Sequence, residues 1–435
     1  MNPLRITRRS FLKATAATAA AGPFVRAHTA RAQDAGEKLN IAVVGTQNQA
    51  WWNITQIADE NIVALCDVDA NYLARAGEQF PGAARYRDFR IMLEKEEKKI
   101  DAVLVAAPDH IHAPASVMAM RLGKHVYCEK PLAHSVWETR LMAKLAREKN
   151  LATQLGTQIH AGGNYRRVVE LIQSGAIGPV RQVHVWCNKS WSNGRYKFGS
   201  SAPAHLDWDL WLGPSAKRPY SEGVHPANWR RYWDWGTGTL GDMACHHMDL
   251  AHWALDLRHP TNVRALGPAV HEVGTPDGMI VHYEHPARGD KPPVNVTWYD
   301  GPNRPSILQA LRTKDGAPLQ WGDGQIFVGD EGMLIADYGR HLLLPEEKFA
   351  DYARPEPYIP DSIGHHAEWI VACKTGSATT CNFDYSGALT ETVLLGNVAF
   401  RVGRALQWDA ANLKVTNAPE ADQYIRPEFR QGWEL

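Results

Sequence analysis

Short apolar runs alternate with amphipathic stretches over residues 38–156. Between the runs, stretches such as 135–149 place apolar residues three and four positions apart, the spacing of a helix that packs one face on a core. Strands that alternate with helices predict a doubly wound parallel sheet, buried on both faces. The runs that we expect to be its strands are 39–45, 62–67, 102–107, 125–128 and 151–156.

The pattern changes after residue 156. A helical stretch at 166–172 precedes a long apolar strand at 180–187, and another helix is expected over 388–406. Later apolar segments are short and separated by turns, which indicates a large, mostly antiparallel sheet with one open face. The segments that carry this pattern most clearly are 294–299, 325–328 and 333–336.

The chain is therefore predicted as α/β, with a first domain at residues 38–156 and a second at residues 157–435. A length of 435 residues allows two domains that each bury a full core. An open sheet face suits pairing between copies of the chain, so we expect a homodimer or a homotetramer.

The first 32 residues differ from the rest. Arg8 and Arg9 form a twin arginine, an Ala-rich apolar run follows to Val25, and small residues at 30–32 precede Gln33. This order of charge, apolar run and cleavage site predicts a Tat signal peptide at residues 1–32 and export to the periplasm. Most of the six cysteines lie in apolar runs, so we expect them to be buried thiols. Tat substrates fold in the reducing cytoplasm before export, so disulfides need not hold the fold.

Charge and hydropathy exclude two classes of partner. Without residues 1–32 the chain keeps 41 basic residues against 47 acidic ones, a balance that provides no electrostatic surface for nucleic acid. No later run approaches the roughly 20 apolar residues that a membrane span needs. We therefore expect no insertion into a membrane after the signal is removed, and a small molecule as the partner.

A cluster of polar residues follows the fourth apolar run. Residues 125–128 end in Glu129, Lys130 and Pro131. Ligands of open parallel sheets bind outside the carboxyl ends of the strands, so Lys130 is expected to point at whatever binds there.

The first two runs give mixed evidence for a dinucleotide. Gly45 follows the first run, and Asp67 lies 22 positions later, where an acid would accept a hydrogen bond from a ribose 2′-hydroxyl and favour NAD over NADP. The G-x-G-x-x-G pattern keeps only its first glycine, and Gln47 stands where the second would let the backbone approach the pyrophosphate. The loop alone leaves open a doubly wound domain that binds no nucleotide.

The second domain contributes two further groups of residues. Seven tryptophans fall between residues 186 and 235, and indole faces pack well on sugar rings, although most of the seven are expected to be core or loop anchors. On the helix expected from Gly241 onward, Asp242, His246 and Asp249 fall within about 60° of one another. Such a face would position a histidine as a general base. A metal site and a polar cap on a buried helix remain as alternatives.

These residues make the chain resemble the Gfo/Idh/MocA family, named after glucose–fructose oxidoreductase, inositol dehydrogenase and a rhizopine-catabolism protein. The resemblance covers essentially the whole chain after the signal. It is carried by Ala107-Pro108-Asp109-His110-Ile111-His112, by Gly123–Leu132 and by Asp242-x-x-x-His246-x-x-Asp249. The stretch 206–214 is similar to that of a Tat-exported branch of the family.

The resemblance implies a Rossmann domain, an α/β domain with an open sheet, and a site between them for tightly bound NAD and a sugar or glycoside. Lys130 would hold the reacting oxygen, His246 would take the hydroxyl proton, and Asp242 would orient the sugar or the lysine. No residue is expected to bind a metal. The cofactor residues that the resemblance implies are Gly45, Gln47, Asn48, Asp67, Pro108, His112, Glu129 and Lys130. The substrate residues that it implies are Gln158, His160, Trp229, Arg230, Asp242 and His247.

Export adds a constraint, because free NAD is scarce outside the cytoplasm. A cofactor that is carried out with the folded protein must return to its starting redox state while it stays bound in the site. One hypothesis is therefore an oxidoreductase that passes hydride from a sugar hydroxyl to a second acceptor. Another is a redox-neutral glycosidase that oxidises a sugar, eliminates the aglycone and reduces the product. A third is a sugar-binding relic that has lost its nucleotide.

Overall fold

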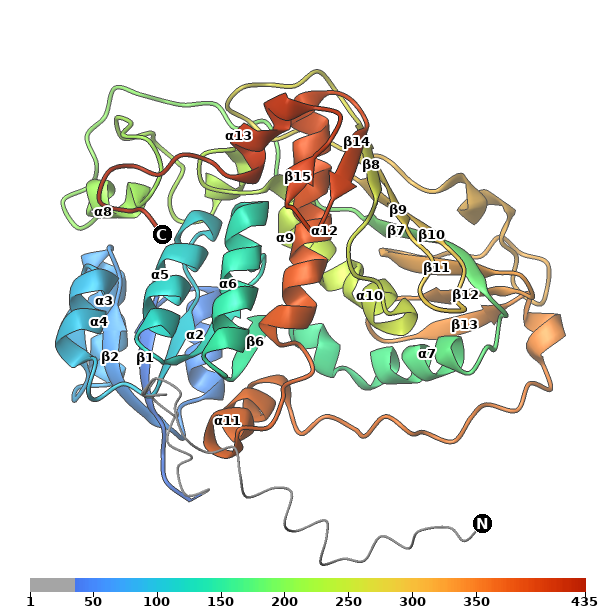
Figure 1. Ribbon diagram of the computed structural model, residues 1–435, viewed down its shortest axis with the longest axis horizontal. Coiled ribbons are helices and arrows are strands. Elements are labelled where there is room, and N and C mark those ends of the chain that lie inside the picture. Colours follow the sequence, from blue (N-terminus) through green and yellow to red (C-terminus); the bar gives the residue numbers. More distant parts are fainter. Residues whose placement is uncertain (1–35) are drawn as a thin grey trace, which may run out of the picture. The chain divides into compact units, whose positions relative to one another are not determined.

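The computed structural model describes residues 36–435, so the signal peptide predicted at residues 1–32 lies outside the described residues (Figure 1). None of the described helices is both long enough and apolar enough to cross a membrane. All six cysteines are buried free thiols, as the apolar runs around them predict.

The first sheet is parallel throughout and has six strands in the order β3-β2-β1-β4-β5-β6. The order reverses between β1 and β4, which is the topological switch point of a doubly wound fold. All five predicted strands are present, and β3 is the one that the sequence pattern did not reveal. The strands are β1 (Asn40–Val44), β2 (Asn61–Cys66), β3 (Ala84–Tyr86), β4 (Ala102–Val105), β5 (His125–Glu129) and β6 (Thr153–Gly156).

Helices cover both faces of this sheet, as expected for a Rossmann domain (Figure 1). Helix α6 begins with a capping box in which Ser135 and Glu138 satisfy each other's backbone N–H groups. The helices of this region are α2 (Gln49–Gln56), α3 (Ala70–Gln79), α4 (Phe89–Glu96), α5 (Asp109–Arg121) and α6 (Val136–Glu148).

The second sheet has nine strands in the order β13-β12-β11-β7-β10-β9-β8-β14-β15. Only the central pair β7–β10 is parallel, so the sheet is mixed and largely antiparallel, as predicted. The strands are β7 (Val180–Cys187), β8 (Asn262–Leu266), β9 (Ile280–His285), β10 (Val294–Asp300), β11 (Gly324–Gly329), β12 (Met333–Ala336), β13 (His341–Leu344), β14 (Leu406–Asp409) and β15 (Lys414–Val415).

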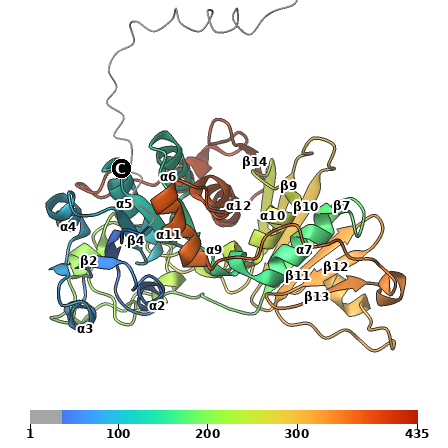
Figure 2. The ribbon, with the colours of Figure 1, turned by 90° about the horizontal axis from the view of Figure 1, so that it is seen from below.

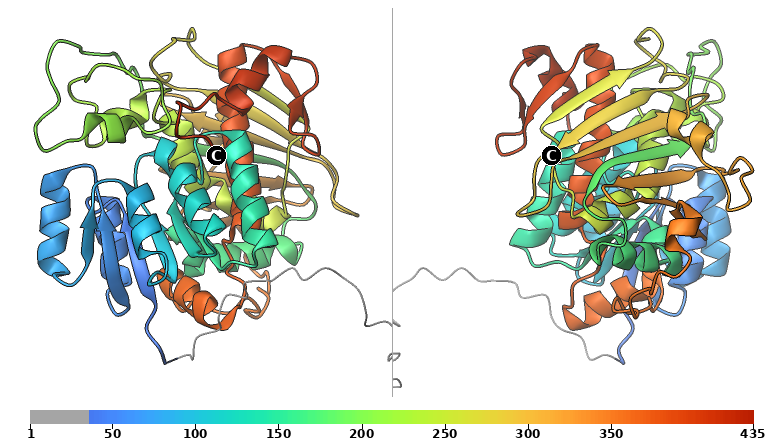
Figure 3. Two further views of the ribbon diagram at one scale, coloured as in Figure 1. Left: turned by 60° about the vertical axis from the view of Figure 1, so that its left-hand side comes forward. Right: turned by 90° about the vertical axis from the view of Figure 1, so that its right-hand side faces the viewer.

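One face of this sheet packs on helices to form the largest core of the described chain (Figure 3). The helices after β6 are α7 (Gly163–Gln173), α8 (Trp208–Leu212), α9 (Gly238–His247), α10 (Asp249–Leu255), α11 (His365–Thr375), α12 (Phe383–Val402) and α13 (Asp422–Ile425). Short 3₁₀ turns lie at Gln158–Ala161, Asn228–Arg231, Ser306–Ala310, Glu346–Phe349 and Pro419–Ala421.

Two details differ from the sequence prediction. The helix expected over 388–406 is α12, which begins earlier and ends at Gly403, where φ is +75°; Leu406 already belongs to β14. The other face of the second sheet is not fully open. Leu308, Leu311 and Trp321 pack there against Trp186 and Ile326, because this end of the sheet presents large apolar side chains on both faces.

The late part of the chain returns to the first domain. Trp369 and Cys373 of α11 are buried in the same core as Leu39 and Tyr127, and Trp433 packs on the ring of Phe89. The core of the first domain is therefore not built from residues 38–156 alone.

Helix α12 lies between the two sheets and packs on α6 of the first domain and α9 of the second (Figure 2). Its Glu391 is fully buried and forms a bidentate ion pair with Arg140 of α6. The same carboxylate accepts a hydrogen bond from the indole N–H of Trp408 and pairs with the ring of His259. Burial alone would raise the pKa of Glu391, but the bonds to His259 and Arg140 hold its pKa below the ordinary value.

Replacing Arg140 with Met should therefore lower the free energy of unfolding by about 3 kcal/mol, because a buried carboxylate loses its main partner. The measurement is the midpoint of urea unfolding. The loss should shrink in acid, since the stabilisation by Glu391 disappears as pH falls through its lowered pKa. The matched control is Arg147→Met, whose partner Asp384 is 55% exposed, and it should change the midpoint little. Equal midpoints for the two variants would contradict the role given to Arg140.

Candidate functional site

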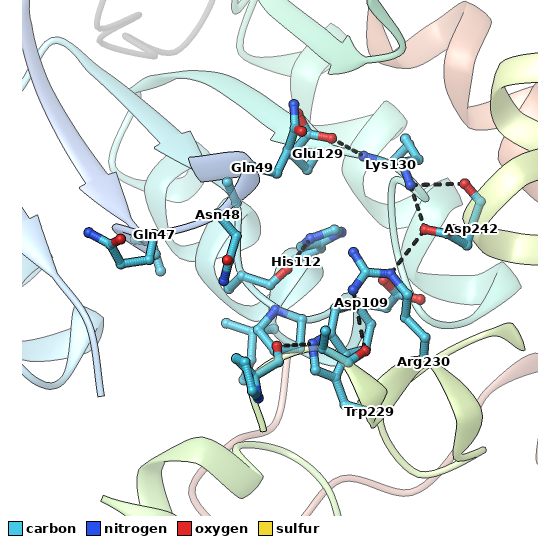
Figure 4. A pocket seen from close by; sticks show the side chains of 18 of the residues that line it. Gln47, Asn48, Gln49, Asp109, His112, Glu129, Lys130, Trp229, Arg230 and Asp242 are labelled. Atoms are coloured by element: carbon cyan, nitrogen blue, oxygen red, sulfur yellow. Dashed lines mark hydrogen bonds and ion pairs between the residues drawn. The ribbon is translucent and has the colours of Figure 1, made fainter. Parts of the chain in front are cut away.

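A cavity of about 600 Å³ lies at the carboxyl ends of the first sheet and reaches α9 of the second domain. Its volume is in the range of ligand pockets. All predicted catalytic residues and all predicted cofactor residues line it (Figure 4). Asp242 was predicted both as a catalytic and as a substrate residue, and three of the other predicted substrate residues line the cavity as well. Those lining residues are Gly45, Gln47, Asn48, Asp67, Pro108, His112, Glu129, Lys130, Gln158, Trp229, Arg230, Asp242 and His246.

The loop after β1 keeps the turn of a phosphate-binding loop although it lacks the second glycine. Gly45 has φ of +89°, and a Cβ there would lie 2.3 Å from the carbonyl oxygen of Ala106. Asn48 has φ of +57° and ψ of −121°, which lies outside the left-handed helical region in which asparagine is common. The N-terminus of α2 that follows has no side-chain cap, so backbone N–H groups remain for an anion. The side chain of Gln47 points away from the other labelled residues (Figure 4).

Asp67 lies at the end of β2, as the spacing from Gly45 predicts. Its carboxylate accepts hydrogen bonds from the backbone and hydroxyl of Thr46 at 2.9 Å each, and from the backbone of Asp69 at 2.9 Å. Burial raises the pKa of Asp67 to about 6, against the opposing effect of these bonds. Oδ1 accepts only one of these bonds and still has room for a further donor, such as a ribose hydroxyl.

Glu129 is held by side-chain amides and does not project freely. Its Oε1 accepts hydrogen bonds from Asn53 and Gln158 at 2.8 Å each and from Gln49 at 3.4 Å. Gly156 of β6 makes room for the carboxyl group, since a Cβ there would lie 2.6 Å from it. Glu129 therefore ties α2 to the strand that presents Lys130.

The ring of His112 is held in the same way. Its nitrogens contact the carbonyl oxygens of Pro131 at 2.7 Å and of Ala107 at 2.8 Å. His112 therefore fixes the start of α5 against the residue that follows Lys130.

Lys130 and Asp242 form the central contact of the cavity. The Nζ of Lys130 lies 2.6 Å from Oδ1 of Asp242, which also accepts from Nε of Arg230 at 3.0 Å; Trp191 donates its indole N–H to Oδ2 at 2.8 Å. Burial alone would raise the pKa of Asp242, but the two cations more than offset it and hold the pKa below the ordinary value. One ionised carboxylate thus orients two cations from different parts of the chain.

His246 lines the cavity one helical turn after Asp242. Its ring forms no hydrogen bond within residues 36–435, although its backbone carbonyl accepts one from Tyr165. Burial, followed by the charge of Lys130, lowers the pKa of His246 well below its ordinary value. The imidazole is therefore neutral near pH 7 and has a free nitrogen lone pair facing the cavity.

Asp249, which the helical spacing placed below His246, lies elsewhere. The helix ends at His247, and Asp249 begins α10, where its carboxylate is fully buried against His160 at 2.9 Å and the hydroxyl of Tyr385 at 2.7 Å. Asp242 is likewise occupied by Lys130 and Arg230. The predicted stack of two carboxylates beneath a histidine is therefore not formed, because the break at Met248 rotates the second carboxylate into the core.

His160 and His247 are also outside the cavity lining, contrary to the expectation that they contact substrate. His160 stacks on Trp253 with ring centroids 4.1 Å apart and pairs with Asp249 in the core. His247 stacks on Tyr338, and its Nε2 lies 3.0 Å from the Tyr338 hydroxyl. Their neighbours hold both rings inside the second domain, so the rings support the walls of the cavity. Nε2 of His160 and Nδ1 of His247 are buried without a hydrogen-bond partner among the described residues.

Asp109, Trp191 and Tyr338 are among the lining residues that sequence reasoning missed. Asp109, at the first turn of α5, accepts a hydrogen bond from the hydroxyl of Thr237 at 2.7 Å. Burial raises the pKa of Asp109 to about 6, although the charge of Arg230 acts to lower it. Trp191 and Tyr338 line the cavity from the second domain. The position of Asp109 after a buried strand was an available signal, but nothing in the spacing distinguished Trp191 or Tyr338.

Most of the tryptophans between 186 and 235 are structural, as expected. Trp211, Trp229 and Trp235 belong to one buried aromatic cluster with Tyr232, and Trp186 and Trp233 are buried in other cores. Trp191, Trp211 and Trp229 also line the cavity. The guanidinium of Arg230 lies 4.1 Å from the ring centroid of Trp229, which fixes its direction.

Two family models match the chain. One, described as "Oxidoreductase family, NAD-binding Rossmann fold", matches residues 39–157, and the other, "Oxidoreductase family, C-terminal alpha/beta domain", matches residues 164–288. Both describe the Gfo/Idh/MocA family, and together they cover more than half of the chain. The chain belongs to this family, and its first domain is an NAD-binding Rossmann domain.

Sequence relatives with known names match in part. A dTDP-3,4-didehydro-2,6-dideoxy-alpha-D-glucose 3-reductase of Streptomyces violaceoruber is 36% identical over 108 residues, 25% of this chain and 31% of the relative. Levoglucosan dehydrogenase of Pseudarthrobacter phenanthrenivorans is 25% identical over 195 residues, 43% of this chain and 41% of the relative. The chain thus matches less than half the length of these relatives.

A solved structure agrees with the fold over nearly its whole length. A structure titled "Levoglucosan dehydrogenase, complex with NADH and L-sorbose" superposes with a TM-score of 0.58 at 16% identity, covering 85% of this chain and 98% of the other.

The residues of the cavity fit NAD. Gly45 is required by the close approach to Ala106, the first turn of α2 is uncapped, and Asp67 stands where a ribose would lie. These residues would hold the nucleotide, and Lys130 and His246 would face its reactive end.

Replacing Gly156 with Ala should weaken NADH binding about tenfold, which is about 1.4 kcal/mol. The added Cβ would displace the Glu129 carboxyl and loosen the link between α2 and Lys130. The measurement is a fluorescence titration of nucleotide-free protein with NADH, with a thermal melt to confirm folding. The control is Gly163→Ala, where a Cβ meets nothing within 4 Å. Equal affinities for the two variants would mean that Glu129 does not position the site.

Proposed function

We propose that the protein is an oxidoreductase that acts on a hydroxyl of a sugar or glycoside and recycles tightly bound NAD(H) within the site. The observation that carries the proposal is the 2.6 Å contact between Lys130 and Asp242 across the cavity, beside a neutral and unpaired His246. A cation and a base that face one space are what the oxidation of an alcohol requires.

Three side chains would have separate roles in the reaction. The ammonium of Lys130, held by Asp242, donates to the reacting hydroxyl oxygen and stabilises negative charge that develops there. A ring nitrogen of His246 accepts the hydroxyl proton. When bound, the nicotinamide supplies a reversible acceptor of hydride. Asp242 stays ionised and keeps the lysine in place, because Arg230 and Trp191 fix its carboxylate.

The substrate contacts that we propose are residues that the sequence predicted for this role and that line the cavity. They are Trp229, Arg230 and Gln158. An indole that carries a guanidinium on its face presents both an apolar surface for a sugar ring and donors for its hydroxyls. The match to levoglucosan dehydrogenase supports a carbohydrate as the substrate class.

The same residues would serve a redox-neutral glycosidase, which is the second candidate. Asp109 favours it, because burial raises its pKa to about 6 and a carboxyl group of this kind is suited to move a proton near neutral pH. A panel of nitrophenyl glycosides separates the two candidates. If nitrophenol is released without an added acceptor and without net formation of NADH, the oxidoreductase hypothesis is wrong. If a free sugar is oxidised only when a second, carbonyl substrate is present, the glycosidase hypothesis is wrong.

Export by the Tat pathway and assembly into a homodimer or homotetramer are parts of the same proposal. Export rests on the twin arginine and the segment that follows it. Assembly rests on the part of the second sheet that its own chain leaves uncovered, where His184 and His282 are half-buried.

Replacing Lys130 or His246 with Ala should lower kcat roughly a hundredfold to a thousandfold while the melting temperature stays near that of the parent. The native kcat/KM should remain level through pH 6.5 and fall only in more acid solution, because the lowered pKa keeps His246 unprotonated. Lys124→Ala, far from the cavity lining, is the control. Near-normal turnover in either variant would remove that residue from the mechanism.

Replacing Asp67 with Ala should raise the affinity for NADPH relative to NADH about tenfold, because the 2′-phosphate no longer meets a carboxylate. In the parent protein the preference for NADH should weaken as pH falls below 6, where Asp67 takes up a proton. Dissociation constants from fluorescence titrations at pH 7.5 and pH 5 measure both effects. An unchanged preference would mean that Asp67 only holds the turn with Thr46.

A further inference from the structure

Residues 205–226 of the second domain, which we name the covering segment, lie against the turn between β2 and α3 of the first domain. The backbone N–H of Ala70 donates to the carbonyl of His205 at 2.8 Å, and that of Asp207 donates to the carbonyl of Val68 at 3.0 Å. Arg87 donates to both of those carbonyls, at 3.2 and 3.0 Å. All of these bonds except the one from Arg87 to Val68 join residues more than a hundred positions apart in the chain.

Asp69 is the centre of this junction. Its Oδ1 caps α3 by accepting from the backbone of Asn71 and Tyr72, and its Oδ2 lies 3.2 Å from Nε2 of His225 in the covering segment. The Asp69 side chain is only 3% exposed, so Oδ2 depends on this histidine for a donor that water does not replace. His205 is a more distant neighbour, at 3.6 Å, and is itself 40% exposed.

The junction continues directly into the nucleotide site. The backbone N–H of Asp69 donates to Oδ1 of Asp67, and Oδ2 of Asp67 accepts from Thr46 of the loop after β1. One chain of hydrogen bonds therefore connects the phosphate loop, the ribose acid and the covering segment.

The middle of the covering segment is fixed to the start of α5. His110 is buried, and its ring nitrogens lie 2.9 Å from the carbonyl of Trp211 and 3.2 Å from that of Trp235. Gly213 has φ of +53°, and a Cβ there would lie 2.4 Å from the side chain of Ile111. The segment is thus pressed onto the first domain at two separate places.

Between these two anchors the covering segment forms one wall of the cavity. Leu210, Trp211 and His225 line it from this side, and Val68, Tyr72 and Phe89 line it from the first domain. These residues continue the cavity lining from Asp67, the acid placed for the ribose. Apolar and aromatic walls on two sides suit a flat heteroaromatic ring.

We propose that the covering segment is the second wall of the binding site for the adenosine half of NAD, and that its junction with Asp69 keeps the nucleotide bound between turnovers. The family match assigns NAD binding to residues 39–157 only, so this wall adds residues of the second domain to the site. The proposal rests on the proposed function for the statement that NAD is recycled in place, but the wall itself depends only on NAD binding.

The test compares nucleotide retention in the parent protein and in His225→Ala. Each full-length protein is desalted and denatured, and its NAD(H) is quantified by HPLC; NADH release is then followed by fluorescence after excess NAD is added. The parent should retain close to one nucleotide per chain, and His225→Ala should lose more than half of it and release NADH at least tenfold faster. The matched control, His205→Ala, removes an exposed ring from the same segment and should behave as the parent does.

Several results would overturn the proposal: a parent protein that loses its nucleotide on desalting, an unchanged release rate in a folded His225→Ala, or an equal acceleration in His205→Ala. If His225→Ala does not fold, Arg87→Gln takes its place. It removes the bond from an exposed side chain to the carbonyl of His205 in the segment, together with the bond to Val68 beside it. Retention is measured without substrate. A protein that retains NAD but oxidises no sugar would therefore overturn the proposed function and leave this wall in place.

Discussion

The carboxylate of Asp242 is the contact on which the site depends. It is buried, it comes from the second domain, and it pairs with Lys130 of the first domain and with Arg230 of the 3₁₀ turn at Asn228–Arg231. A buried charge is tolerated only when its partners are held in place, so this carboxylate requires the two domains to keep one relative position. The cavity, the direction of the lysine ammonium and the free face of His246 follow from that requirement.

The rest of the interface is built by similar means. Glu391 of α12 is buried against Arg140 of α6, and Asp69 at the end of the first sheet is buried against His225. Each contact joins a carboxylate of one domain to a basic group of the other, away from water. Between them lie apolar contacts of α11, α12 and the C-terminal Trp433 with the first domain. The nucleotide site is therefore a feature of the whole chain and not of the Rossmann domain alone.

Much of the first domain could be predicted because its signals are local. A buried parallel strand is a short apolar run, and the residues that follow each run, such as Gly45, Asp67 and Lys130, necessarily meet at one edge of the sheet. The second domain was harder. Its strands β8, β9 and β13 are short and mixed in polarity, and the helix after Gly238 looked continuous through Asp249. A one-residue break at Met248 sends that carboxylate to His160, and no periodicity reveals such a break.

The sequence by itself determined the class of fold, the strand ends that carry Gly45, Asp67 and Lys130, and the helix that carries Asp242 and His246, because each depends on neighbours within a few residues. Only the tertiary structure decided that Asp242 pairs with Lys130 and Arg230, that His160 and His247 lie outside the cavity, and that residues 205–226 reach Asp69. Those contacts join residues about 90 to 160 positions apart in most cases. Their geometry is set by how two cores pack together, which the spacing of residues along a chain does not encode.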